Sequence, residues 1–385
     1  MESVIQTMIN CISYEVCGGT EKIVLPECSM QFLTKLYKLS KAHDVAHLVG
    51  DALNKLGILD SGELKNKFEK QIYTAVYRYE NINVELEEIR RILRAENVDF
   101  IPLKGSVIRC YYPEPWMRTS SDIDILIKSD QLKLAISTLI DRLSYEQKGE
   151  WIDEISLYSP SGVHVELHCT LVADCVIEPV DNVLSDIWTY AERVDGTSEY
   201  ELKDEAYYYY HIAHMAKHVM HGGCGVRPFI DLWLLEHKIE HSNEKRNTLL
   251  ECGGLSKFAE VSRALSKVWF DGDKQTDVTR EFENYIFRGG VYGTNTNRIA
   301  IQRQKHGGKF KYVFSRIFIP YEEIKFYYPI LQKHKWLTPI MEVRRWGKLI
   351  FCGHLKRTVK ELKYNNTISD DAAAETRTLL KNIGL

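Results

Sequence analysis

The stretch Asp122-Ile-Asp-Ile-Leu-Ile127 decides the fold class of this chain of 385 residues. Side chains on a strand alternate between its two faces, so Asp122 and Asp124 share one face and isoleucines occupy the other. The isoleucines anchor the strand in a core, while the two carboxylates project together, roughly 7 Å apart along the chain. This pattern predicts a strand with one apolar and one acidic face.

A second segment, Gly162-Val-His-Val-Glu-Leu-His168, repeats this alternation and places three polar side chains on one face: His164, Glu166 and His168. If this strand neighbours the first, three carboxylates converge, and they repel one another unless a cation lies between them. The acids of a D-x-D strand alone are more simply explained as the polar outer face of an amphipathic strand. Their combination with Glu166 and an upstream glycine favours a metal site.

The expected ion follows from the ligand chemistry. Carboxylate oxygens favour Mg²⁺, or Mn²⁺, over zinc. Two such ions about 3.5–4 Å apart activate the attacking oxygen and stabilise the leaving oxygen in a displacement at phosphorus. We therefore expect Asp122, Asp124 and Glu166 to be both the metal ligands and the catalytic residues of a site for two magnesium ions.

Upstream, Phe100-Ile-Pro-Leu-Lys-Gly-Ser106 reads as a strand that ends in a Gly-Ser turn before a helix start. Free backbone N–H groups at a helix start favour phosphate, and Gly105 would let the backbone approach it closely. A turn without a ligand is the usual explanation of a lone Gly-Ser, but this one lies shortly before Asp122. Lys104 and Arg118 could neutralise a triphosphate there, or be exposed surface cations.

A Gly-Ser turn, an Asp-x-Asp strand and a third carboxylate on a later strand resemble the DNA polymerase β nucleotidyltransferase superfamily. Between about residues 30 and 240 the chain is similar, more narrowly, to a bacterial family of uncharacterised nucleotidyltransferases with L-K-G and R-x-x-x-D-[IL]-D-[IL]-L signatures. The matching motifs are Leu103-Lys-Gly105, Pro115-x-x-Arg118, Asp122-Ile-Asp124-Ile-Leu, His164-Val-Glu-Leu-His168, His211-x-x-His214-x-x-Lys-His218 and Arg227-Pro-x-x-Asp231-Leu.

The resemblance implies a nucleoside triphosphate bound through its phosphates at Gly105-Ser106. It further implies that Asp122 and Asp124 bridge both metals and that Glu166 completes the site that activates an acceptor hydroxyl. The expected reaction is transfer of a nucleoside monophosphate to a small-molecule hydroxyl with release of pyrophosphate. Two alternatives stay open: a tRNA or other RNA acceptor, as in a toxin, and a nucleotide-binding protein without turnover.

The resemblance also predicts an α+β fold in which a polymerase β-type core, a mixed sheet with helices, is flanked by helical N- and C-terminal regions. Strands are expected at 98–102, 122–127 and 162–168, and helices at 130–143, 204–221, 227–238, 255–269 and 277–288. The expected domains are an N-terminal helical region (1–95), the catalytic core (96–200), a helical domain that completes the active site (201–290), and a basic, aromatic C-terminal helical region (291–385).

Several accessory residues have two readings. The histidines of segment 204–221 share one helix face and could bind zinc, be satisfied core histidines, or line the substrate pocket with His214, Lys217 and His218 nearest. His168 could orient a carboxylate or the acceptor, or form only a structural hydrogen bond. Arg227 could line the pocket or brace its helix by pairing with Asp231, four residues later.

The stretch 288–316 is the one region that could hold RNA, through phosphate contacts and stacking. A solvated basic face or a lid over the triphosphate is the more ordinary account. Its basic and aromatic residues are Arg288, Tyr292, Arg298, Arg303, Lys305, Lys309, Phe310, Lys311, Tyr312, Phe314 and Arg316.

Composition excludes several protein classes. Hydrophobic residues at 44% and charged residues at 27% are typical of a globular protein, and a net charge of −3 gives no overall nucleic-acid signature. Nine cysteines without a C-x-x-C pattern predict reduced thiols. We find no signal peptide and no membrane span, so we expect a cytoplasmic protein with no membrane association and no obligate protein partner.

Overall fold

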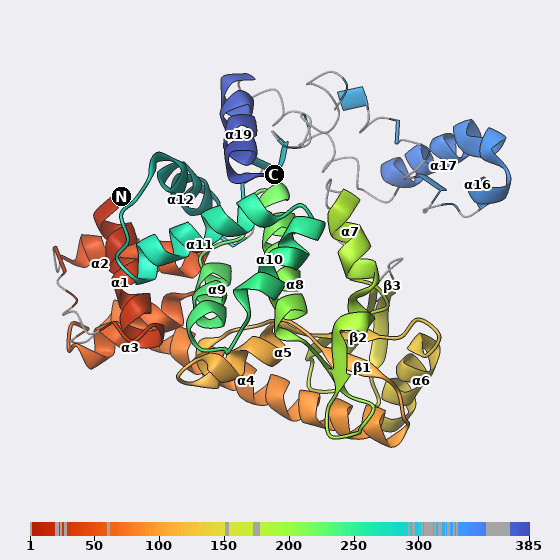
Figure 1. Cartoon of the computed structure of the whole chain (residues 1–385), viewed down its shortest axis with the longest axis horizontal. Coiled ribbons are helices and arrows are strands. Elements are labelled where there is room, and N and C mark those ends of the chain that lie inside the picture. The colour runs from red at the N-terminus through yellow and green to blue at the C-terminus, as the bar shows by residue number, and fades with distance from the viewer. Residues whose placement is uncertain are drawn as a thin grey trace.

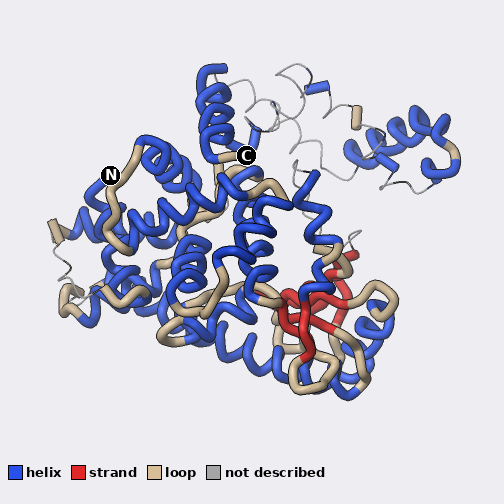
Figure 2. Tube along the Cα trace, in the orientation of Figure 1, coloured by secondary structure: helices blue, strands red, loops and turns tan. Residues whose placement is uncertain are grey.

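The computed structural model of the chain describes residues 2–19, 23, 25–26, 29–59, 62–150, 154–171, 178–291, 330–351 and 370–385, with scattered residues between 293 and 328. A mixed sheet of five strands lies at one end of a largely helical molecule (Figure 1, Figure 2). The predicted α+β class is therefore confirmed. Within this part of the chain, no helix is both long enough and apolar enough to cross a bilayer.

The sheet has the strand order β1-β2-β5-β4-β3, in which only β2 and β5 are parallel. A crossover through α6 (Leu132–Leu143) and the β3–β4 hairpin connects these two central strands. A separate ribbon pairs β6 (Ala191–Arg193) with β7 (Tyr200–Leu202). The five strands are β1 (Phe100–Pro102), β2 (Asp122–Ile127), β3 (Glu146–Glu150), β4 (Glu154–Tyr158) and β5 (His164–His168).

The two faces of the sheet have different surroundings. Ile123, Ile125 and Ile127 of β2 are fully buried in a core that includes apolar residues of α4 (Glu63–Ala95) and of α6. Leu126, on the opposite face of β2, belongs to a second core that includes residues of α8 (Asp204–Met220). One face of the sheet is thus sealed by apolar packing, and the acidic face is directed toward the helical part of the molecule.

Helices make up most of the described chain on either side of the sheet in sequence (Figure 1). The others are α1 (Glu2–Val16), α2 (Met30–Ala42), α3 (Ala46–Lys55), α5 (Gly105–Ile108), α7 (Glu178–Ser185), α9 (Arg227–His237), α10 (Asn243–Cys252), α11 (Ser256–Phe270), α12 (Asp277–Gly289), α16 (Ile330–Lys333), α17 (Thr338–Phe351) and α19 (Asp370–Ile383). Short 3-10 turns cover Arg109–Tyr111, Pro115–Met117, Ile187–Tyr190 and Lys335–Leu337.

The predicted strands and helices are confirmed to within about two residues, but β3, β4, β6, β7, α7 and α10 were not predicted. Ile155 and Leu157 of β4 are buried in alternation, but this pattern is too short to be recognised as a strand in the sequence. β3 is an edge strand with a polar sequence, which protects an edge from further pairing but gives no periodic apolar signal. The domain boundaries remain a prediction.

Candidate active site

The sheet brings the three predicted carboxylates together. On the parallel strands β2 and β5, Asp124 lies directly opposite Glu166 and Asp122 lies opposite His164. Two sets of side chains, which share Glu166, each have ligand atoms within 4.8 Å of one another. They are Asp122, His164 and Glu166, and Asp124, Glu166 and His168. The expectation that the two acidic strands are neighbours is confirmed, and either set could hold a divalent metal ion.

Asp124 is buried and has two cationic or polar partners on one oxygen. Lys104 Nζ lies 2.6 Å from Asp124 Oδ1, and His168 Nε2 lies 3.0 Å from the same atom. Burial alone would raise the pKa of Asp124, but Lys104 and His168 outweigh it and hold that pKa well below its usual range. Asp124 is therefore ionised at neutral pH, and His168 donates to it, as one of its two predicted readings requires.

Asp122 has the opposite electrostatic environment. Burial, and then the charge of Asp124, raise the pKa of Asp122 above its ordinary value. The Ser121 hydroxyl donates to the Asp122 carboxylate at 3.3 Å, and no lysine or arginine of the described residues forms an ion pair with it. Two carboxylates two residues apart thus differ in charge compensation, because only Asp124 is neutralised by the protein itself.

The turn before α5 positions Lys104. This residue has a φ of 48° and a ψ of −123°, a strained conformation for a side chain with a Cβ. The Tyr207 hydroxyl donates to its carbonyl at 3.0 Å, and the Leu103 N–H donates to the Asp124 carbonyl at 3.0 Å. The strain is held by these contacts and directs the ammonium group to Asp124.

Gly105 has a packing role in addition to its predicted one. A Cβ at this position would lie 3.2 Å from Ser120 Cβ, closer than most contacts allow. The N–H groups of Ser106 and of the next residue donate within the turn, to the Leu103 and Lys104 carbonyls, so the helix start offers fewer free N–H groups than expected. Ser106 Oγ, however, is buried without a hydrogen-bond partner among the described residues. That hydroxyl is an unsatisfied group that a phosphate oxygen could satisfy.

Comparison with known proteins identifies the family. The profile described as "Uncharacterised nucleotidyltransferase" matches residues 32–271, which include every carboxylate and turn residue described above. The chain belongs to this family. No match was found among curated proteins or among solved structures. Membership supports a transferase with a nucleotide substrate, and the clustered acids and histidines are consistent with nucleotidyl transfer.

Arg118 lies in a buried ion pair rather than on an open surface. Its Nε and Nη2 each lie 2.8 Å from an oxygen of Asp231, and the Tyr112 hydroxyl donates to Asp231 at 2.6 Å. The predicted pairing of Asp231 with Arg227 is wrong, because a buried bidentate contact is more favourable than one i,i+4 pair. Arg118 braces α9 against the segment before β2, and its contact with a triphosphate stays a prediction.

Arg227 instead reaches the loop between α2 and α3. Its Nη1 lies 2.7 Å from Asp44 Oδ2 and 3.0 Å from the Thr119 carbonyl. The pKa of Asp122 is raised mainly by burial and that of His218 is lowered mainly by burial, and the charge of Arg227 makes only a minor contribution to each. The predicted position of Arg227 in the substrate pocket stays a prediction.

The histidine face of α8 is directed at the acidic cluster. His214 Nε2 and His218 Nε2 lie 3.1 Å apart, and burial followed by the charge of Lys104 lowers the pKa of both. Lys217 adds to the lowering at His218, and His211 donates to the Pro228 carbonyl at 2.9 Å. Among the described residues, no third ligand joins this pair, so the zinc alternative has no structural support.

The buried histidines His214 and His218 predict that the fold loses stability in acid. Burial and Lys104 lower the pKa of His218 to about 4, so the unfolded chain binds this proton more tightly than the folded chain. The contribution of His218 to stability is complete above pH ~6.5 and is lost as the pH falls toward 4. Between pH 7.5 and pH 5, the free energy of unfolding should fall by about 2 kcal/mol less in His218→Gln than in wild type.

Urea denaturation at the two pH values measures this difference. His241→Gln is the matched control, because His241 lies in the loop that joins α9 to α10 and its ring bonds a local carbonyl, that of Ile239. An equal fall in stability for wild type, His218→Gln and the control would contradict the assignment of acid sensitivity to the α8 pair.

The structure describes only some residues of the stretch 288–316, which could hold RNA. Arg303 is buried and has a partner, which removes it from a surface that contacts phosphate, whereas Arg288 and Lys311 are exposed. Arg298 is half-buried and Phe314 is exposed. The other members lie outside the described residues, namely Tyr292, Lys305, Lys309, Phe310, Tyr312 and Arg316. The RNA-binding role of this stretch stays a prediction.

Sequence reasoning left two residues of this site without a role. The alternation placed His164 on the strand face of Glu166, but no function was assigned to it. Arg109 bonds the Gly105 carbonyl at 2.6 Å and the Ser120 hydroxyl at 2.8 Å, and so fixes the turn. No sequence signal marked Arg109, because its partners are set by the tertiary fold.

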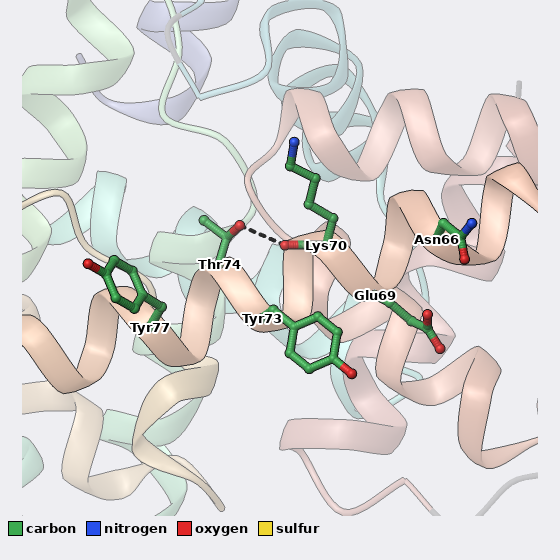
Figure 3. A pocket seen from close by; sticks show the side chains of 6 residues that line it. All are labelled: Asn66, Glu69, Lys70, Tyr73, Thr74 and Tyr77. Atoms are coloured by element: carbon green, nitrogen blue, oxygen red, sulfur yellow. Dashed lines mark hydrogen bonds between the residues drawn. The ribbon is translucent and has the colours of Figure 1, made fainter.

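A separate pocket of about 350 Å³ lies on α4, and Figure 3 shows its lining. All of its residues come from that one helix, so it is an open groove in which one lysine and one glutamate offset each other. It provides no converging donors for a triphosphate. The lining residues are Asn66, Glu69, Lys70, Tyr73, Thr74 and Tyr77.

Proposed function

We propose that the protein transfers a nucleoside monophosphate from a nucleoside triphosphate to the hydroxyl of a small-molecule acceptor and releases pyrophosphate. One observation carries the proposal: Asp124 and Glu166 face each other on paired parallel strands, with Asp122 two residues earlier on the same face. Family membership supplies the reaction class.

The ligand atoms of the acidic cluster fit divalent cations. Asp122, Asp124 and Glu166 supply hard oxygen ligands, and Asp122 lacks a protein cation of its own among the described ion pairs. When bound, the ions, Mg²⁺ in the simplest case, would polarise the phosphate oxygens and offset the charge that develops on them. The carboxylates lie in a partly buried setting, where electrostatic interactions are stronger than in water.

Bond changes follow from the chemistry of the substrates. The acceptor oxygen forms a bond to the α-phosphorus while the bond from that phosphorus to the bridging oxygen of the β-phosphate breaks. Pyrophosphate takes the electron pair, and the hydroxyl proton passes to Glu166, which is half-buried, and then to solvent. Glu166 suits this role because its oxygens are reached from solvent while it shares the face of both aspartates.

Triphosphate binding is assigned to the turn and its neighbours. The unsatisfied Ser106 hydroxyl offers a donor to a phosphate oxygen, next to the closely packed Gly105. Lys104 neutralises Asp124 in this structure, and its ammonium group would be the cation nearest to a triphosphate bound at the turn. His214 and His218 form the opposite wall of the pocket as neutral hydrogen-bonding groups, with Lys217 and Arg227 at its edge.

Calorimetric titration of ATP, GTP, CTP and UTP, with and without Mg²⁺, tests the proposed triphosphate site. We expect metal-dependent binding of one nucleotide, lost in the Asp122→Asn, Asp124→Asn double variant and kept in Asp130→Asn, an exposed aspartate beyond the same strand. Binding that needs no metal and survives in the double variant would contradict the assignment, as would the absence of binding by all four nucleotides.

A further inference from the structure

Two imidazoles flank the shared carboxylate of the candidate metal site. His164 and His168 stand two residues before and after Glu166 on β5, so all three project from one face of the strand. Each imidazole completes a different three-ligand set with Glu166 and one aspartate. Both sets therefore offer one nitrogen and two carboxylates, which differs from an all-oxygen site.

The ring of His164 is held in one orientation. Its Nε2 is bonded to the Ser156 hydroxyl at 3.1 Å, and the ring stacks on Tyr158 with centroids 4.7 Å apart and planes 21° apart. Its other nitrogen, Nδ1, lies 3.6 Å from Glu166 Oε1. Histidines that bind metals use the same arrangement, in which one ring nitrogen is fixed by a hydrogen bond and the other faces the ion.

The two sets differ in how their charge is balanced. The set around Asp124 already contains the ammonium group of Lys104 and a hydrogen bond from His168. In the set of Asp122, His164 and Glu166, no lysine or arginine of the described residues forms an ion pair with Asp122. An added cation therefore relieves more repulsion in this second set.

We infer that Asp122, His164 and Glu166 form a binding site for a divalent transition-metal ion of the Mn²⁺ type, with His164 Nδ1 as a nitrogen ligand, in preference to Mg²⁺. The inference rests on the proposed function only in that it identifies the ion of the same site. Imidazole suits ions such as Mn²⁺ and those later in the first transition row, whereas Mg²⁺ keeps oxygen ligands and water.

Pulsed electron paramagnetic resonance of bound Mn²⁺ tests the nitrogen ligand directly, without nucleotide and without turnover. We expect ¹⁴N coupling in the wild-type spectrum, retained in His168→Gln and in the control His241→Gln, and lost in His164→Gln. Titration of free Mn²⁺ should give an affinity at least about tenfold higher than that for Mg²⁺, and His164→Gln should remove most of this difference.

Bound Mn²⁺ without ¹⁴N coupling in the wild-type protein would overturn the inference, and this measurement needs no variant to fold. Coupling that persists in His164→Gln, or equal affinities for Mn²⁺ and Mg²⁺, would also overturn it. These outcomes are separable from failure of the proposed function. An all-oxygen site with metal-dependent nucleotide binding would leave the proposed transfer standing, while nitrogen ligation without nucleotide binding would leave only the metal site.

Discussion

Replacing Asp122 with asparagine should lower nucleotidyl transfer by roughly a thousandfold and should not lower the melting temperature. The loss follows because an amide cannot supply the negative charge that holds a cation beside Glu166. Stability should hold because burial and Asp124 raise the pKa of Asp122. A carboxyl with a raised pKa stabilises the fold only at low pH, and its ionised form is a cost at neutral pH that asparagine removes.

Turnover and thermal unfolding, measured on the same preparation, separate the two effects. Asp130→Asn is the matched control, since it makes the same chemical change at an exposed position and should alter neither quantity. Transfer within tenfold of wild type would contradict the metal-binding role of Asp122, and a marked fall in melting temperature would show that it has a structural role.

Arg118→Met should lower the free energy of unfolding by about 3–5 kcal/mol. The substitution leaves Asp231 buried without its ion-pair partner, and among the described residues the Tyr112 hydroxyl is the side-chain donor that remains. The pair joins α9 to the segment before β2. We therefore expect the main cooperative unfolding transition, measured by urea denaturation, to shift to a lower urea concentration.

Two comparisons make this prediction specific. The double variant Arg118→Met, Asp231→Leu should recover a large part of the lost stability, because it replaces the buried pair by apolar groups. Arg91→Met removes an exposed pair with Glu88 and should have no measurable effect. A loss for Arg118→Met as small as that for Arg91→Met would contradict a structural role for the pair.

The strands that carry the site were predictable because their chemistry repeats with the period of the backbone. Three isoleucines alternating with two aspartates fix which face of β2 is buried, and the same alternation positions Glu166 and His164 on β5. That the two strands are neighbours was an expectation, whereas their parallel direction and the register that brings Asp124 opposite Glu166 were not predicted. The polar edge strand β3 gave no such signal.

Ion pairs could not be predicted from spacing. Arg227 and Asp231 are four residues apart on α9, yet each has its partner in a distant segment, at Asp44 and Arg118. The same holds for Lys104, whose contact with Asp124 depends on a strained backbone conformation that sequence does not reveal. Local periodicity reports which side of an element is buried, but partners across the fold are chosen by tertiary geometry.

The most direct test of nucleotidyl transfer follows the two ends of the triphosphate. The protein is incubated with Mg²⁺ or Mn²⁺, with nucleotide labelled at the α- or the γ-phosphate, and with either a small-molecule extract or RNA. We predict that the α label enters a small molecule, that the γ label leaves as pyrophosphate, and that Asp122→Asn does neither. Transfer of the γ label would contradict the proposal by indicating a kinase, α label in RNA would indicate the other acceptor, and no transfer under any condition would indicate a protein that only binds nucleotides.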